Sequence, residues 1–167
     1  STGDRNSALG YAANYKNTTG YYNVAMGYAS MYENTTGAAN TGVGYNSLGA
    51  NTTANNNTGV GAYTLEDNST GTANVAVGAG ALKNNTTASN NVGLGLDALM
   101  TNTTGTLNTA VGQGAAQSNS TGGAITAVGK DAGYSVTADH NTLYGSGAGY
   151  TISTGTQNVI AGSNAGY

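Results

Sequence analysis

The amino-acid sequence predicts an all-β fold, a parallel β-solenoid (β-roll) of about ten coils, in a homotrimeric or filamentous assembly. Three observations predict it: a 17-residue repeat along the whole chain, a strand-like phrase opening each repeat, and no proline among 167 residues. A fixed period of this length is typical of folds that stack one unit on the next. Because the amides of each coil must pair with neighbouring coils, the lack of proline fits such stacking.

The repeat is marked by a glycine in an A-V-G-like triplet. These glycines are 17 residues apart, except for one 16-residue step between Gly129 and Gly145. The units begin near residues 6, 23, 40, 57, 74, 91, 108, 125, 141 and 158, so residues 1–167 form a single repeat array. Asn opens every unit except the one at Ile125.

The opening phrase of each unit predicts a short strand. In residues 74–78, N-V-A-V-G, a β-branched residue, a small residue and an aliphatic residue precede the glycine. Side chains alternate between the two faces of a strand, so the small and aliphatic residues face opposite ways. We expect the aliphatic position to face the core, and we name it the aliphatic row: Leu9, Met26, Val43, Val60, Val77, Leu94, Val111 and Val128.

The rest of each unit predicts a second strand and a turn. A small residue is followed in several units by a large apolar one, as at Met31, Leu48, Leu65, Leu82 and Leu99. The phrase N-T/S-T-G/A then favours a turn, because Asn and Thr bond neighbouring backbone and Gly adopts positive φ. Each unit is therefore predicted to contain two brief strands and two turns.

The Asn of this turn phrase has two readings. In the pattern N-T/S-T it is a sequon for N-glycosylation. Stacked Asn side chains can instead hydrogen-bond from coil to coil, and the Asn that opens each unit, which lacks a sequon, favours this second reading. We name these residues the turn-Asn row: Asn17, Asn34, Asn51, Asn68, Asn85, Asn102 and Asn119.

Tyrosines recur at two positions of the unit. The first tyrosine row is Tyr11, Tyr28 and Tyr45, and the second is Tyr15 and Tyr32, continued by Tyr134, Tyr150 and Tyr167. Aromatic rows can bind sugar rings by their faces, or they can stack on one another and line a protein interface. The sequence favours stacking or an interface and leaves sugar binding open.

Composition excludes several classes of function. Charged residues are 7% of the chain with a net charge of −3, so no basic patch exists to bind nucleic acid. No apolar run is long enough to span a bilayer, and the absence of Cys excludes disulfides. The abundance of Gly, Asn, Thr and Ser is also typical of disorder, but the strict period favours a folded array.

No residue pattern predicts catalysis, a cofactor or a metal. His140 is the only histidine and has only scattered carboxylates near it in the sequence, so we expect an exposed turn residue. Glu66 and Asp67 are adjacent and therefore diverge rather than act as an acid–base pair. The glycine-rich phrase at Gly145 belongs to the repeat and is not followed by the Lys-Ser/Thr of a phosphate loop. The chain is predicted not to be an enzyme.

The repeated phrases resemble a known family. NVAVGAGAL at Asn74, NVGLGLDAL at Asn91 and NTAVGQGAA at Asn108, each followed by NTT or NST, are similar to head repeats of trimeric autotransporter adhesins. They are still more similar to the N-T-A-x-G…N-T-T-G arrays of bacteriophage and prophage tail-fibre proteins. This resemblance implies left-handed β-rolls that form trimers through the apolar face of each coil. Two departures are the 17-residue unit, longer than the typical adhesin repeat, and the looser pattern from Ile125 onward.

We therefore expect a structural, non-catalytic fibre segment, a shaft or head that gives length, rigidity and surface attachment. Its location would be extracellular, on a cell surface or a virion, and its partners would be copies of itself and a surface glycan or host receptor. The alternatives are a self-polymerising extracellular filament subunit and a glycan- or ice-binding solenoid. The sequence has no initiator Met and no polar capping units, so we also expect these 167 residues to be part of a longer chain.

Overall fold

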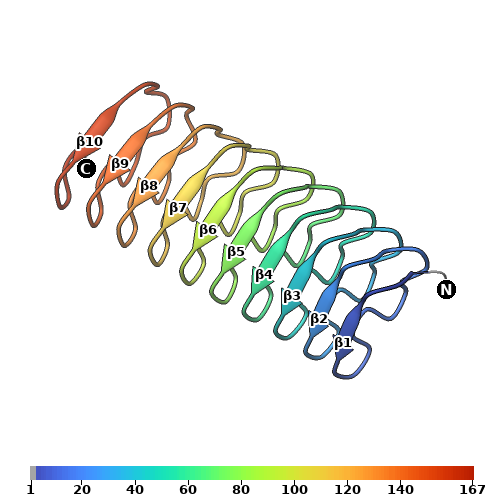
Figure 1. The fold of residues 1–167 in the computed structure, drawn as a ribbon. Coiled ribbons are helices and arrows are strands. Elements are labelled where there is room, and N and C mark those ends of the chain that lie inside the picture. Colours follow the sequence, from blue (N-terminus) through green and yellow to red (C-terminus); the bar gives the residue numbers. More distant parts are fainter. Residues whose placement is uncertain (1–2) are drawn as a thin grey trace.

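One three-residue strand recurs in every coil, and the strands form one parallel sheet. The computed structural model describes residues 3–167 and shows a parallel β-solenoid of about 17 residues per turn. Its sheet holds the strands in sequence order, from β1 at one end to β10 at the other (Figure 1). Their bounds are Ser7–Leu9, Val24–Met26, Thr41–Val43, Thr58–Val60, Val75–Val77, Val92–Leu94, Thr109–Val111, Thr126–Val128, Thr142–Tyr144 and Val159–Ala161.

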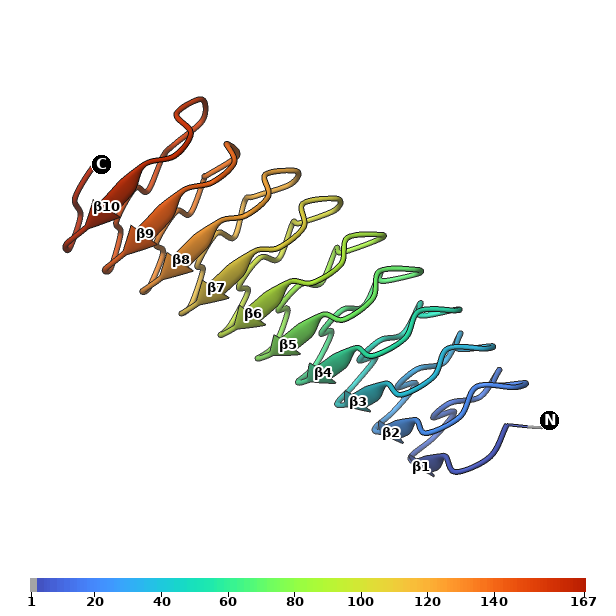
Figure 2. The same ribbon diagram turned by 45° about the horizontal axis from the view of Figure 1, so that its top comes forward.

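Equivalent residues of successive units pair in register. Val75 lies opposite Val92 and Val77 opposite Leu94, both 17 residues on. At the single 16-residue step the register is kept, since Val128 pairs with Tyr144. The chain therefore advances as a rod with its two termini at opposite ends, and the strands occupy one side of it (Figures 1 and 2).

The second strand predicted for each unit is absent from the described residues; a run of turns takes its place. In the second unit this run covers residues 28–33. Ala29 and Met31 both have a φ of 53°, so left-handed residues alternate with others and the segment cannot extend. Coil-to-coil bonding continues nevertheless, because the Met31 N–H donates to Ser47 O at 2.9 Å and the Glu33 N–H to Gly49 O at 3.0 Å.

Left-handed backbone at a bulky exposed residue gives a first testable prediction. Leu107 has a φ of 63° and is 63% exposed. A left-handed conformation costs an L-residue about 1–2 kcal/mol, which glycine avoids, although glycine loses about 0.5–1 kcal/mol of backbone entropy. We expect Leu107→Gly to raise the free energy of unfolding by about 0.5–1 kcal/mol in urea titrations.

The matched control is Leu96→Gly. Leu96 is also exposed, at 47%, but its φ is not positive. This change removes no strain, so it should lower stability. Equal effects of the two glycines would contradict the strain argument.

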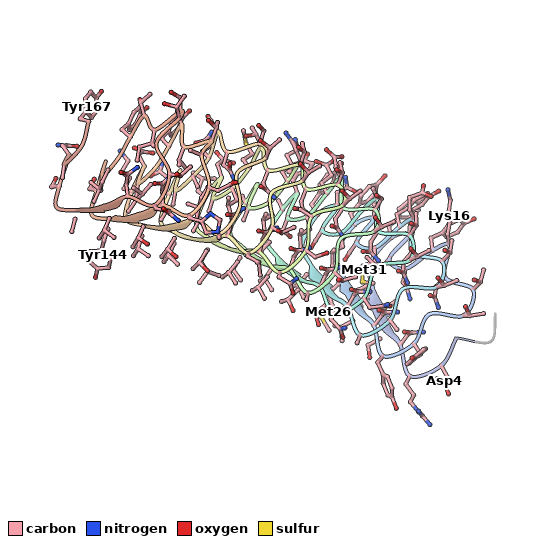
Figure 3. The ribbon with its side chains drawn as sticks, turned by 90° about the horizontal axis from the view of Figure 1, so that it is seen from above. Asp4, Lys16, Met26, Met31, Tyr144 and Tyr167 are labelled. Atoms are coloured by element: carbon pink, nitrogen blue, oxygen red, sulfur yellow. The ribbon has the colours of Figure 1, made fainter. Side chains whose placement is uncertain are left out.

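The core is built from a small residue of each strand and a large residue of the facing turns. The middle residue of a strand points inward, as Ala25 and Ala76 do. Facing them is a row of fully buried large side chains, which we name the core row: Met31, Leu48, Leu65, Leu82 and Leu99. Figure 3 shows Met31 between the walls of the solenoid, whereas Met26 projects from the strand side.

The size pattern of the core reverses near the C-terminus. The core-row position becomes Gly133 and Gly149, while the middle strand residue becomes Leu143. A Cβ added at Gly133 would lie 2.4 Å from Leu143 Cδ1, so Leu143 fills the space that the missing leucine leaves. Total volume is kept and the core stays dense. The looser sequence after Ile125 is thus a different packing of the same coil.

Candidate interaction surfaces

The aliphatic row lies on the outer face of the sheet, so its predicted place in the core is wrong. Met26 and Val77 are each 39% exposed, Val60 is 37% and Leu9 is 69% exposed. The remaining members, Val43, Leu94, Val111 and Val128, are half-buried. All eight belong to the third position of a strand, β1 to β8.

Close approach of the two walls explains this orientation. A Cβ added at Gly42 would lie 2.7 Å from Ser30 Oγ and 3.1 Å from Met31 Cγ. The middle position is therefore restricted to Gly or Ala where it faces a large core-row residue, as at Gly42 and Ala76, and the larger Val would not fit. The strand must turn its small residue inward, and its two larger neighbours then face outward.

The outer face of the sheet is uncharged. None of the residues in β1–β10 is Asp, Glu, Lys, Arg or His. The first strand position adds a second row beside the aliphatic row, with Ser7 in β1 and Val or Thr in β2–β10, as at Val75 and Thr58. No strand has Thr at its third position, so Thr never occupies both outward positions of one strand and this face lacks T-x-T rows. An apolar stripe therefore runs along the described rod, with Tyr144 projecting near its C-terminal end (Figure 3).

The turn-Asn row is a buried hydrogen-bonded ladder. Asn68 Nδ2 donates to Asn51 Oδ1 of the preceding coil at 3.2 Å and to Gly71 O at 2.9 Å. Asn85 repeats both bonds with Asn68 Oδ1 and Ala88 O. Six members are fully buried, and Asn17 in the first coil is partly buried. Glycosylation of a buried member would require its amide to leave the core, so the geometry favours the ladder reading.

The Asn that opens each unit forms a second ladder inside the coil. Asn74 Oδ1 accepts from the backbone N–H of Asn91 at 3.0 Å, and Asn74 Nδ2 donates to Ala88 O at 2.9 Å. Buried amides are tolerated because each polar atom has a partner. Ile125 occupies this position once: its N–H donates to Asn108 Oδ1 at 2.9 Å, but it has no side-chain acceptor to continue the ladder.

The tyrosine rows stack along the rod. Tyr11 and Tyr28 have ring centroids 5.2 Å apart, and Tyr28 and Tyr45 are 5.3 Å apart with planes inclined by 7°. In the second row Tyr15 and Tyr32 stack at 5.4 Å. Tyr134, Tyr150 and Tyr167 form a further stack in the same register. Within a stack the ring faces cover each other, so edges and hydroxyls meet the solvent.

Two hollows lie beside the tyrosine rows of the first coils. A groove of about 420 Å³ separates the two rows and is lined by Tyr11, Ala12, Tyr15, Tyr28, Ala29 and Tyr32. A notch of about 360 Å³ adjoins it and is lined by Ala29, Tyr32, Glu33, Asn46, Gly49, Ala50, Glu66 and Asp67. The sequence reasoning missed the notch. Its signal was the interruption of the second row by Gly49 where the two preceding units have Tyr.

Charged residues pair between coils near these hollows. Lys16 Nζ lies 2.7 Å from Glu33 Oε2 and 5.1 Å from the centre of the Tyr32 ring. The hydrogen bond to Glu33 raises the pKa of Lys16. Lys83 repeats the arrangement, 3.4 Å from Glu66 Oε2 and 5.2 Å from the Tyr63 ring centre. These pairs are exposed and therefore add little stability; their carboxylates, Glu33 and Glu66, line the notch.

The residues considered for metal or acid–base chemistry do not converge. No group of three or more His, Cys, Asp or Glu suited to a metal ion occurs within residues 3–167. His140 is an exposed turn residue with a φ of 60°, and Asp139 Oδ1 accepts from the Gly123 N–H at 2.8 Å. Glu66 is held by Lys83 and by Asn46 Nδ2, while its neighbour Asp67 is exposed.

Comparisons with protein-family models, curated proteins and solved structures find no match for this chain. Among the described residues, no helix is long and apolar enough to cross a membrane. The repeat and the β-solenoid therefore stand on the sequence and the structure themselves.

Proposed function

We propose that this chain is a structural, non-catalytic segment of an extracellular fibre, which associates laterally with copies of itself. The observation that carries the proposal is the uncharged outer face of the sheet, where the aliphatic row runs beside a row of Val and Thr. At a strand spacing of about 4.8 Å, ten strands extend this stripe over roughly 45 Å. Long exposed apolar surfaces of this kind mark sites of association.

A second copy of the chain fits this face better than an unrelated partner. Its apolar side chains repeat at the same coil spacing, so rows of two parallel copies stay in step along the whole rod. No charged residue belongs to a strand: Asp4 and Arg5 precede β1, and the others lie in the turns and bends between strands. Contact through the strands themselves therefore buries no charge. The resemblance to adhesin heads and tail-fibre repeats supports a parallel trimer, exposed on a cell surface or virion.

Assembly of the 167-residue chain tests the proposal. We expect sedimentation and negative-stain imaging to show elongated homo-oligomers that are several times the 16.4 kDa chain mass. Val77→Asp places a charge in the middle of the apolar stripe, where Val77 is 39% exposed. It should dissociate the oligomer while the β-type circular dichroism remains.

The matched control is Thr87→Asp. Thr87 is exposed on a turn outside the sheet, so the same added charge should leave the sedimentation unchanged. A monodisperse 16.4 kDa monomer for the unmodified chain would overturn the proposal. Filaments that persist in Val77→Asp would favour the alternative, end-to-end polymerisation of single rods.

A further inference from the structure

The notch exists because one unit lacks the side chains that its neighbours carry. In the second tyrosine row Tyr15 and Tyr32 are followed, one unit on, by Gly49. At the next position Lys16 and Glu33 are followed by Ala50. A gap one coil wide therefore opens on the turn side of the rod, with Tyr32 and Glu33 on one wall and Glu66 and Asp67 on the other.

The gap leaves one face of an aromatic ring uncovered. Tyr15 stacks on Tyr32 with planes inclined by 8°, and Lys16, from the same coil as Tyr15, lies over the Tyr32 ring. On the opposite side the residue in register is Gly49, whose coil is joined to this one by the bond from the Glu33 N–H. Tyr32 stacks on no other described ring, so its second face borders the notch.

Polar groups surround this free face. Asn46 Nδ2 donates to Glu66 Oε1 at 2.6 Å, and Lys83 Nζ lies 3.4 Å from Glu66 Oε2. Asn46 and the carboxylates of Glu33, Glu66 and Asp67 all line the notch, and a carboxylate oxygen can accept more than one hydrogen bond. Although Asp67 is exposed, partial desolvation beside the notch and, to a smaller extent, Glu66 raise its pKa, and Lys83 opposes that shift. The walls thus combine one apolar aromatic face with several hydrogen-bond acceptors.

A neutral sugar matches this combination. One face of a pyranose can carry only C–H groups, which pack on the electron-rich face of an aromatic ring, while its hydroxyls donate to acceptors at the rim. Ligand sites are in general concave and apolar with a few placed polar groups. The carboxylates Glu33, Glu66 and Asp67 would repel an acidic sugar.

The adjoining groove adds room for a second residue of a chain. It shares Tyr32 and Ala29 with the notch and is floored by Ala12 and Ala29. Its walls present tyrosine ring edges, because the ring faces there are stacked. An extended oligosaccharide could therefore run along the rod from the notch into the groove.

We propose that the notch at Gly49 is a binding site for a neutral pyranose of an oligosaccharide, which stacks on the free face of Tyr32. The site goes beyond the fibre function, since a shaft needs no ligand. It is also independent of the outer face, because it lies on the turns of a single chain.

Binding is tested on the unmodified chain with a panel of methyl β-pyranosides: glucoside, galactoside, N-acetylglucosaminide and glucuronide. Saturation-transfer NMR should detect at least one neutral glycoside, with the strongest transfer to the C–H groups of one ring face, and much weaker transfer to the glucuronide. Absence of transfer to every neutral glycoside, or equal transfer to the glucuronide, would overturn the proposal.

Two variants locate the site. Tyr32→Ala should weaken binding by about tenfold or more, which corresponds to 1.4 kcal/mol. Asn46→Ala combined with Gly49→Tyr gives this unit the Tyr-Ala-Ser-x-Tyr pattern of residues 28–32, so it should fold, extend the stack and abolish binding. Gly49 has no positive φ, and the three atoms nearest to an added Cβ belong to the Asn46 side chain, which the Asn46→Ala change shortens.

The matched control is Gln117→Tyr, which extends the distant stack of Tyr134 and Tyr150 without touching the notch. It should bind as the unmodified chain does. Unchanged binding in the Asn46→Ala, Gly49→Tyr variant would overturn the proposal. Val77→Asp lies on the sheet, so this variant should still bind sugar even where its oligomer dissociates. The fibre proposal and the sugar-site proposal can therefore be contradicted independently.

Discussion

Leu82→Asp should abolish folding, whereas Val77→Asp should not. Leu82 is fully buried in the core row, between the equivalent leucines of the neighbouring coils. Truncating such a leucine to Ala already costs about 2–5 kcal/mol, and an unpaired carboxylate adds a large desolvation cost. A thin coil has no second core to compensate for this loss.

Circular dichroism and urea unfolding of purified variants check this result. Leu82→Asp should lack the β-type spectrum, and the milder Leu82→Ala should remain folded with a lower midpoint. Val77→Asp should keep the spectrum, because its side chain is on the outer face of β5. Loss of the spectrum in Val77→Asp alone would show that the assignment of faces is incorrect.

The period of the sequence was sufficient to predict the fold, because register follows directly from equal spacing. Each glycine of the A-V-G-like triplet predicted one coil, and each coil pairs with the next as expected. The faces of the strand were not predictable in the same way. A three-residue strand can bury either its middle residue or its two outer residues. The choice depends on how closely the facing wall approaches, as at Gly42 and Met31.

The second predicted strand failed for a related reason. Leu and Met at the core-row position suggest extended structure, since bulky residues seldom adopt a positive φ. Met31 and Leu82 adopt it at 53° and 51°, because the turn directs these side chains into the coil while its backbone bonds to the next. The positive φ of the core-row residues is thus set by packing between coils, and the sequence of a single unit does not reveal it.

The candidate surfaces differ in how far the sequence revealed them. Stacking of the tyrosines and bonding between turn-Asn side chains follow from identical residues at identical positions, as for Tyr28 and Tyr45 or Asn51 and Asn68. The notch instead depends on what one unit lacks. Only comparison of Gly49 with Tyr32 in the same register reveals the uncovered ring face.

Gly78→Ala, at the turn that follows β5, should strongly destabilise the rod. Gly78 has a φ of 116°, a backbone conformation that L-residues rarely adopt. A Cβ there would also lie 2.7 Å from the carbonyl carbon and oxygen of Gly95 in the next coil. Backbone strain contributes about 1–3 kcal/mol and the steric overlap about as much again, so we expect a loss of about 2–6 kcal/mol.

Gly162→Ala separates the two contributions. Gly162 has a similar φ of 125°, but its added Cβ would meet only Ala165 Cβ at 3.6 Å. In the 167-residue chain this variant carries the strain without the overlap, so urea unfolding should show a loss of about 1–3 kcal/mol. The difference between the two variants measures how tightly successive coils approach. If Gly78→Ala were no more destabilising than Gly162→Ala, the coils would have to separate freely at this turn, and the glycine would be required for its φ alone.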